Sequence, residues 1–250
     1  MKIGLALGGG VVRGATHLGV LSTLLEANIQ IDYIAGTSAG SIMAGLFASG
    51  KSPEQIYEFT QGMGWSKFVR PTLNKRGFIS FARMEPLLNE FINDVAIEDF
   101  PIPCAIVATD MNEGIPYVFS AGQVGKAVRA SSSIPGVVVP VELNGRLLCD
   151  GGVSNNCPVD VLRDMGADYV IAVDLFTPEK PRFGLFGVLR STLLTSVRSS
   201  GGGIHQADCL IVPDLAGKSF VRFSQTDEFI QLGKEATLAQ LEKIKDDISK

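Results

Sequence analysis

The chain has 250 residues, of which 46% are hydrophobic and 19% are charged, and its net charge is -4. This length allows one large domain whose core needs neither metals nor disulfides, so we expect residues 1–250 to form a single domain. The high apolar content excludes a disordered chain, and the acidic balance argues against nucleic acid as a partner.

The cysteines and the N-terminal residues indicate a cellular location. The first apolar run is too short for a signal sequence before glycines interrupt it, and no apolar run reaches membrane-spanning length. The cysteines lie in or beside apolar runs without metal-binding spacing, so they predict reduced, buried side chains: Cys104, Cys149, Cys157 and Cys209. We therefore expect a soluble cytoplasmic protein.

The first 50 residues alternate between strand and helix patterns. Residues 2–7 predict a buried strand, and the glycines at 8–10 lead into a helix with an apolar stripe. Residues 31–35 predict a second strand, and residues 41–49 a second helix that Gly50 ends. This β-α-β-α order favours a parallel sheet with helices on both faces.

The remaining elements are less regular. Residues 53–103 predict mainly helix, at 53–63 and 83–92, and the irregular stretch 64–80 between them is a candidate cap over the site. Further strands are expected at 104–109, 117–120, 137–143, 146–149, 169–174 and 210–212, and further helices at 124–130, 158–165 and 225–248, with a hairpin turn at Asn144-Gly145. Within 176–203, the apolar residues 184–194 predict a core helix, with a lipid-facing or lid element as the alternative.

A serine lies between two glycines directly after the second strand, in the run Gly36-Thr37-Ser38-Ala39-Gly40. This pattern is typical of a nucleophile elbow, in which a strained turn exposes the serine hydroxyl and the crowded flanking positions, here Gly36 and Gly40, admit little beyond glycine. Ser38 is therefore the candidate nucleophile.

A nucleophilic serine needs a base to take its proton. His17 lies on the apolar face of the first helix and predicts a core residue, while His205 follows a glycine run and predicts an exposed loop. Asp150 ends an apolar strand and is followed by Gly151 and Gly152, which would let the Ser38 loop approach closely. We expect Asp150 to be the base, provided that burial raises its pKa.

A glycine-rich loop, Gly8-Gly9-Gly10-Val11-Val12-Arg13-Gly14, joins the first strand to the first helix. Its backbone amides and the helix N-terminus favour an oxyanion or a phosphate. A nucleotide-binding loop is the alternative, but Arg13 breaks the usual glycine spacing and no acidic residue ends the second strand to hold a ribose.

Together these motifs resemble the patatin-like phospholipase family, whose members combine a G-G-G-x-[KR]-G loop, a G-x-S-x-G elbow and a D-G-[GA] motif. The likeness extends over roughly residues 3–240. It includes residues 130–136 with their Ser-Ile-Pro-Gly ending, Asn156, Pro158 and residues 165–168. The motif order and the 112 positions that separate Ser38 from Asp150 suit a small bacterial member.

The resemblance implies a three-layer α/β/α fold around a central, mostly parallel sheet, and it implies a role for each motif. Ser38 would be the nucleophile and Asp150 the base of a Ser-Asp dyad. The supporting positions are the oxyanion-hole amides of Gly9, Gly10 and Val11, the loop supports Arg13 and Gly14, and the D-G-G glycines Gly151 and Gly152. Val11 departs from the family's glycine, and a positive φ there would strain a β-branched residue and reduce activity.

The resemblance further implies a serine acyl hydrolase, of the phospholipase, lysophospholipase or carboxylesterase kind, that needs no metal or cofactor. Its partner would be a lipid or acyl-ester substrate, reached by transient contact with a membrane surface. Two alternatives stay open: an acyltransferase or thioesterase that uses the same dyad, and a non-catalytic regulatory member of the fold, which only Val11 favours.

Overall fold

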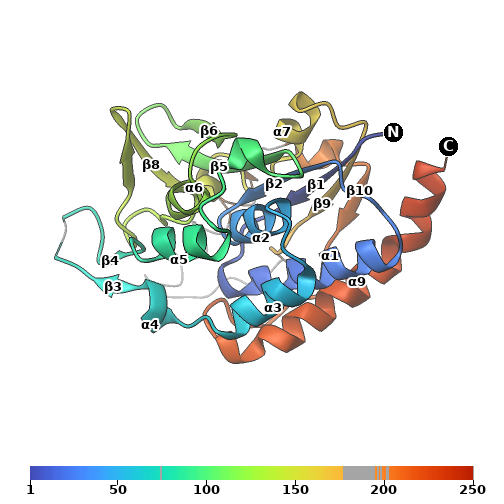
Figure 1. Ribbon diagram of the computed structural model, residues 1–250, viewed down its shortest axis with the longest axis horizontal. Helices are drawn as coiled ribbons and strands as arrows, with labels where there is room; N and C mark the ends of the chain where they lie inside the picture. Colours follow the sequence, from blue (N-terminus) through green and yellow to red (C-terminus); the bar gives the residue numbers. More distant parts are fainter. Residues whose placement is uncertain (74, 177–194, 196, 198, 201–202, 250) are drawn as a thin grey trace.

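The computed structural model describes residues 1–73, 75–176, 195, 197, 199–200 and 203–249 (Figure 1). Within these residues the main sheet has the strand order β10-β9-β1-β2-β5-β8-β7, with β6 also beside β5. The strands from β10 to β5 in this order are parallel, and β6, β7 and β8 run antiparallel to their neighbours. Their bounds are β1 Ile3–Leu7, β2 Tyr33–Thr37, β5 Cys104–Asp110, β6 Ile115–Phe119, β7 Val141–Leu143, β8 Arg146–Asp150, β9 Tyr169–Val173 and β10 Cys209–Ile211.

Helices cover both faces of this sheet and confirm the expected three-layer α/β/α fold with a mostly parallel sheet (Figure 1). Helices α1, α2 and α9 lie on one side, where α1 packs along α9, and α7 lies on the other side. The α-helical bounds are α1 Thr16–Glu26, α2 Ala39–Ala48, α3 Pro53–Gln61, α4 Trp65–Phe68, α5 Met84–Phe91, α6 Val124–Ser131, α7 Val159–Asp164 and α9 Thr226–Ile248.

The two faces of the sheet carry side chains of different size. Along β1, Leu5 and Leu7 face the core beneath α1, α2 and α9, whereas Ala6 faces the cluster that includes α7. The same alternation occurs on β9, where Ile171 points to the first cluster and Ala172 to the second. The small side chains let α7 pack closely against the sheet. Burial of the strands on both faces is typical of a parallel sheet.

Several local expectations differ from the structure. The strand expected at 137–143 is confined to β7, after Pro140, and Val138 instead forms a bridge with Ile79. The stretch 64–80 contains α4 and a two-stranded ribbon of β3, Arg70–Pro71, and β4, Ile79–Ser80. The hairpin turn is confirmed, because Asn144 and Gly145 both have positive φ. The helix expected at 184–194 lies outside the described residues.

All four cysteines are free and buried, as expected from their apolar surroundings. No helix among the described residues is both long enough and apolar enough to cross a membrane.

Candidate active site

The pairing along β5 brings Ser38 and Asp150 together. Ile106 and Val107 pair with both β2 and β6, and the residues from Ala108 onward pair with both β8 and β6. Since a strand has only two edges, β2 and β8 share the edge opposite β6. The end of β2, Thr37, pairs with Val107, and the end of β8, Asp150, pairs with Ala108. Two strands that run in opposite directions therefore end at adjacent positions.

The turn after β2 has the strained geometry of an elbow. Ser38 has φ 52° and ψ -120°, in a region that few non-glycine residues adopt, and it precedes the first turn of α2. A Cβ at Gly36 would lie 2.4 Å from the Gly40 carbonyl oxygen, and one at Gly40 would lie 2.0 Å from that of Leu7. Close backbone approach therefore requires both glycines.

A buried serine holds the elbow in place. The Ser131 hydroxyl, at the end of α6, accepts a hydrogen bond of 2.7 Å from the Ser38 amide and donates one of 2.5 Å to the Val107 carbonyl. Sequence reasoning noted residues 130–136 without assigning this role. The available signal was a run of serines where the surrounding helix is otherwise buried.

Ser38 and Asp150 form a direct hydrogen bond. The Ser38 hydroxyl donates to Asp150 Oδ2 at 2.8 Å, and the Gly152 amide donates to Asp150 Oδ1 at 2.8 Å. Both side chains are 8% exposed. Burial raises the pKa of Asp150 to about 6, although the donors Gly152 and Ser38 lower it in part. The carboxylate therefore gains basicity from desolvation and remains ionised at neutral pH.

Gly151, next to this carboxylate, lies against the β2 and β5 strands. A Cβ there would come within 2.1 Å of the Val107 carbonyl oxygen and 2.9 Å of the Thr37 side chain. This glycine of the D-G-G run therefore permits the close approach expected from the sequence.

Neither histidine replaces the carboxylate. His17 is fully buried, and its Nε2 lies 2.7 Å from the Gly8 carbonyl oxygen. Because a carbonyl oxygen only accepts hydrogen bonds, Nε2 carries a proton and donates it to this oxygen. Burial lowers the pKa of His17 to about 4, so the ring is neutral at pH 7. His205 lies exposed in a short 3-10 helix, Ile204–Gln206. Both positions agree with the structural roles expected from the sequence.

The glycine loop lies beside Ser38, and its geometry corrects one expected donor. The Gly9 amide donates to two oxygens of Asn156, the backbone carbonyl at 3.4 Å and the side-chain Oδ1 at 3.2 Å. This amide is therefore already occupied. The amides of Gly10 and Val11 have no hydrogen-bond acceptor among the described residues. Asn156, which sequence reasoning noted only as part of the family likeness, thus orients the loop.

Val11 has φ 53°, the left-handed conformation in which a β-branched residue is strained. Its side chain packs against the main core and lines an apolar cavity next to Ser38. Apolar burial therefore offsets part of the backbone strain, which is of the order of 1–3 kcal/mol.

Arg13 and Gly14 attach the loop to its neighbours. The fully buried Arg13 guanidinium donates to the Lys218 carbonyl at 2.6 Å and stacks 3.6 Å from the centre of the Phe220 ring. A Cβ at Gly14 would lie 2.5 Å from that of Ala39, so Gly14 lets the loop pack on the start of α2. Arg13 thus ties the glycine loop to the segment that precedes α9.

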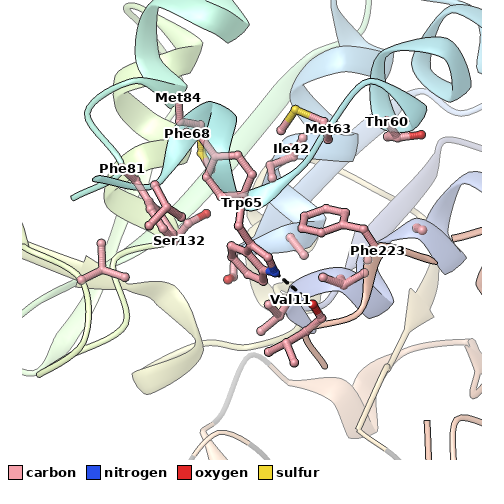
Figure 2. Close-up of a pocket in the computed structure, with 18 of the residues that line it drawn as sticks. Val11, Ile42, Thr60, Met63, Trp65, Phe68, Phe81, Met84, Ser132 and Phe223 are labelled. Carbon is pink, nitrogen blue, oxygen red and sulfur yellow. Dashed lines mark hydrogen bonds between the residues drawn. The ribbon is translucent and has the colours of Figure 1, made fainter. Parts of the chain in front are cut away.

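Ser38 lines an apolar cavity of about 490 Å³. Figure 2 shows this cavity, with ten of its other lining residues labelled. Its walls come from residues 11–15, from residues 38–43 at the elbow and the start of α2, from residues 59–84, from residues 132–138 and from residues 221–226. The Trp65 indole donates to the Val221 carbonyl at 2.9 Å, and its ring packs edge-on against Phe223 at 5.1 Å, so these two segments join above the cavity. The stretch 64–80, expected to form a cap, therefore supplies part of the wall.

Among the described residues, the Ser132 hydroxyl is a polar group of this cavity without a hydrogen-bond partner. The Ser132 hydroxyl is buried, lines the cavity and forms no hydrogen bond among the described residues, whereas those of Thr60 and Thr226 each donate to a nearby carbonyl. No group of three or more metal-ligating side chains is present in the part of the chain that the structure describes.

The site combines three features: a serine elbow at the end of a parallel strand, a buried aspartate that accepts a hydrogen bond from this serine, and a glycine loop beside both. These features define proteins with a Ser-Asp dyad on a three-layer α/β/α fold. The model of the family "Patatin-like phospholipase" matches residues 5–163. The chain belongs to this family.

Relatives and solved structures agree with this membership. An uncharacterized NTE family protein of Mycobacterium tuberculosis is 36% identical over 177 residues, which are 70% of this chain and 49% of that protein. The human patatin-like phospholipase domain-containing protein 6 is 32% identical over 195 residues, which are 74% of this chain and 14% of that protein. The chain therefore spans about half the length of the mycobacterial relative. The crystal structure of VipD from Legionella pneumophila shares the fold, with a TM-score of 0.67 and 13% identity over 97% of this chain and 67% of that chain.

Proposed function

We propose that this protein is a serine acyl hydrolase that cleaves lipid esters through Ser38 and Asp150. The observation that carries this proposal is the 2.8 Å hydrogen bond from the Ser38 hydroxyl to a buried carboxylate at the edge of an apolar cavity. Membership in the patatin-like phospholipase family and the name of the human relative support the same chemistry.

The reaction begins when Ser38 Oγ attacks the ester carbonyl carbon and its proton passes to Asp150 Oδ2. The amides of Gly10 and Val11 are the donors available to the oxyanion that develops on the carbonyl oxygen, and the N-terminus of α2 adds positive potential. Collapse of the tetrahedral intermediate releases the alcohol, which takes the proton from Asp150. Water, deprotonated by the same carboxylate, then hydrolyses the acyl-enzyme.

The cavity supports a substrate with a long acyl chain. Its lining is aliphatic and aromatic apart from a few hydroxyl groups, so it favours a hydrocarbon chain over a charged group. Each methylene that enters contributes about 0.8 kcal/mol, close to a fourfold gain in affinity. We therefore expect kcat/KM to rise with acyl length until the chain fills the cavity.

The test uses p-nitrophenyl esters of graded length with the wild type and with Ser38→Ala. The wild type should hydrolyse them with a preference for longer chains, and Ser38→Ala should lose at least about 10³-fold in kcat, because no other hydroxyl among the described residues donates to the Asp150 carboxylate. Ser22→Ala, on the remote helix α1, is the matched control and should keep the wild-type rate. Full turnover by Ser38→Ala would refute the assignment.

Two further measurements address the alternatives. Covalent labelling of Ser38 by a fluorophosphonate, absent in Ser38→Ala, would exclude a non-catalytic member. Product analysis with added glycerol or a thiol would separate hydrolysis from acyl transfer, since hydrolysis yields free acid whether or not the acceptor is present.

A further inference from the structure

The segment from Gly62 to Met84 is strongly basic in a chain that is acidic overall. It contains five basic residues and no acidic one, whereas the whole chain has a net charge of -4. All five lie on the surface: Lys67, Arg70, Lys75, Arg76 and Arg83. Only Arg76 forms an ion pair among the described residues of this segment, with Glu142 on β7. The remainder of the molecule is therefore more negative than the chain as a whole.

The same segment presents the most exposed large apolar side chains that the structure describes. Leu73 is fully exposed at 104% and Phe78 is 75% exposed, and both lie between β3 and β4 in the chain. This ribbon projects from the body of the molecule (Figure 1). We name the exposed residues Arg70, Leu73, Lys75, Arg76 and Phe78 the ribbon patch. Apolar tips among cations are typical of a surface that contacts anionic lipid.

The ribbon patch is continuous with the cavity. Ile79 lines the cavity and forms a bridge with Val138, and the Phe78 amide donates to the Val137 carbonyl at 2.9 Å. Val137 and Val221 both line the cavity, yet both are also exposed to solvent, Val137 at 45% and Val221 at 59%. These two residues mark where the cavity meets the surface, so one opening lies next to the exposed ribbon.

We propose that the ribbon patch docks on the surface of an anionic lipid bilayer, with Leu73 and Phe78 in the interface and the cations against lipid phosphates. This proposal rests on the proposed function, because it names the surface through which an acyl chain reaches Ser38. Charge complementarity supports a bilayer, since an anionic surface attracts this segment and repels the rest of the molecule. An acyl chain entering beside Val137 leaves the bilayer without crossing water.

The test measures binding of the Ser38→Ala protein to sedimented vesicles, so that turnover does not alter the lipid. Vesicles of phosphatidylcholine alone are compared with vesicles that contain about one third phosphatidylserine. We expect binding to the anionic vesicles that weakens as salt rises. Each cation near an anionic surface contributes about fivefold in affinity, so Arg70→Glu with Lys75→Glu should weaken binding by at least about tenfold.

A second variant, Leu73→Ser with Phe78→Ser, separates insertion from charge. It should weaken binding to anionic vesicles while keeping the salt dependence, because the cations remain. The matched control is Leu238→Ser with Lys245→Glu, on the exposed side of α9, which should bind within about twofold of the parent. Thermal unfolding confirms that each variant folds.

Failure of this proposal is distinguishable from failure of the proposed function. If the parent does not bind anionic vesicles, or if the ribbon variants bind as tightly as the α9 control, the docking surface is wrong even where p-nitrophenyl esters are hydrolysed. If vesicles are bound through the ribbon patch but no ester is cleaved by the wild-type protein, the docking surface stands and the hydrolase assignment fails.

Discussion

The dyad and the cavity beside it are built in different ways. Around Ser38 and Asp150 the structure uses small residues, backbone pairing and buried hydrogen bonds, and it leaves no room for a Cβ at Gly36 or Gly40. The cavity instead uses large apolar side chains from five segments, among them the aromatic cluster of Trp65, Phe68 and Phe223. The dyad is therefore determined by backbone register, and the cavity by side-chain volume.

The two regions should therefore tolerate substitution differently. A substitution at the dyad leaves a buried polar group unpaired or displaces a strained backbone, so it should affect the rate for every substrate. A substitution in the cavity wall exchanges one apolar contact for another, so it should change which substrates fit while the chemistry is preserved.

Asp150→Asn should lower kcat by about 10³-fold or more for esters of every length, because an amide cannot accept the Ser38 proton. The Asn side chain has nearly the same shape, so the loss reports chemistry and not packing. Initial rates with p-nitrophenyl butyrate and decanoate provide the measurement. A loss below about tenfold would show that another group acts as the base.

The pH dependence should follow the buried carboxylate. Since Asp150 must be ionised to accept a proton and burial raises its pKa to about 6, kcat/KM should fall about tenfold for each pH unit below 6 and level off above 7. A profile that stays flat between pH 5 and 8, measured in buffers of constant ionic strength, would contradict this assignment.

The same pKa shift predicts a change in stability. Because Asp150 holds its proton more tightly in the folded state, its contribution to the free energy of unfolding decreases as pH rises from about 4 to 6. His17, whose pKa is lowered to about 4, has the opposite effect. Its contribution to the free energy of unfolding increases as pH rises from about 4 to about 6.5. Removing the carboxylate in Asp150→Asn should therefore leave a protein whose stability rises with pH in this range, measured by urea unfolding.

Ile42→Trp should alter chain-length preference without altering the dyad. Ile42 lines the cavity on α2, and a larger ring there fills part of the space for the acyl chain. We expect kcat/KM for p-nitrophenyl decanoate to fall by about tenfold while the butyrate rate stays within about twofold. Ile42→Ala, which enlarges the cavity, is the matched comparison and should shift the preference toward longer chains. Equal losses for both esters would show that cavity and dyad are not separable.

Val11→Gly should have the smallest effect. The change relieves the backbone strain of a valine in the left-handed conformation, but it also removes the apolar contacts of that valine. The two contributions to the free energy are each about 1–3 kcal/mol and nearly cancel. The backbone amide is retained, so kcat should stay within about threefold of the wild type. A gain of more than tenfold would show instead that the strained valine holds the loop away from its best geometry.

The elbow and the strands around it were predictable from the sequence because their geometry is local. Gly36 and Gly40 flank Ser38 within one turn, and the apolar run that precedes them specifies a strand whatever lies elsewhere in the chain. The alternation of strand and helix patterns likewise indicated the parallel sheet. The core position of His17 followed from its place on an apolar helix face.

Which of these residues meet depends on contacts between distant parts of the chain. Ser38 and Asp150 are 112 positions apart, and their contact depends on the register of β2 and β8 along one edge of β5, which no local pattern specifies. The orientation of the Gly9 amide depends on Asn156, which lies 147 positions away in the chain. The cavity depends on how Trp65 and Phe223 pack across segments. Long-range packing selects among pairings that local propensity leaves equivalent, and for that reason the sequence alone named the reacting groups but not the shape of the space they face.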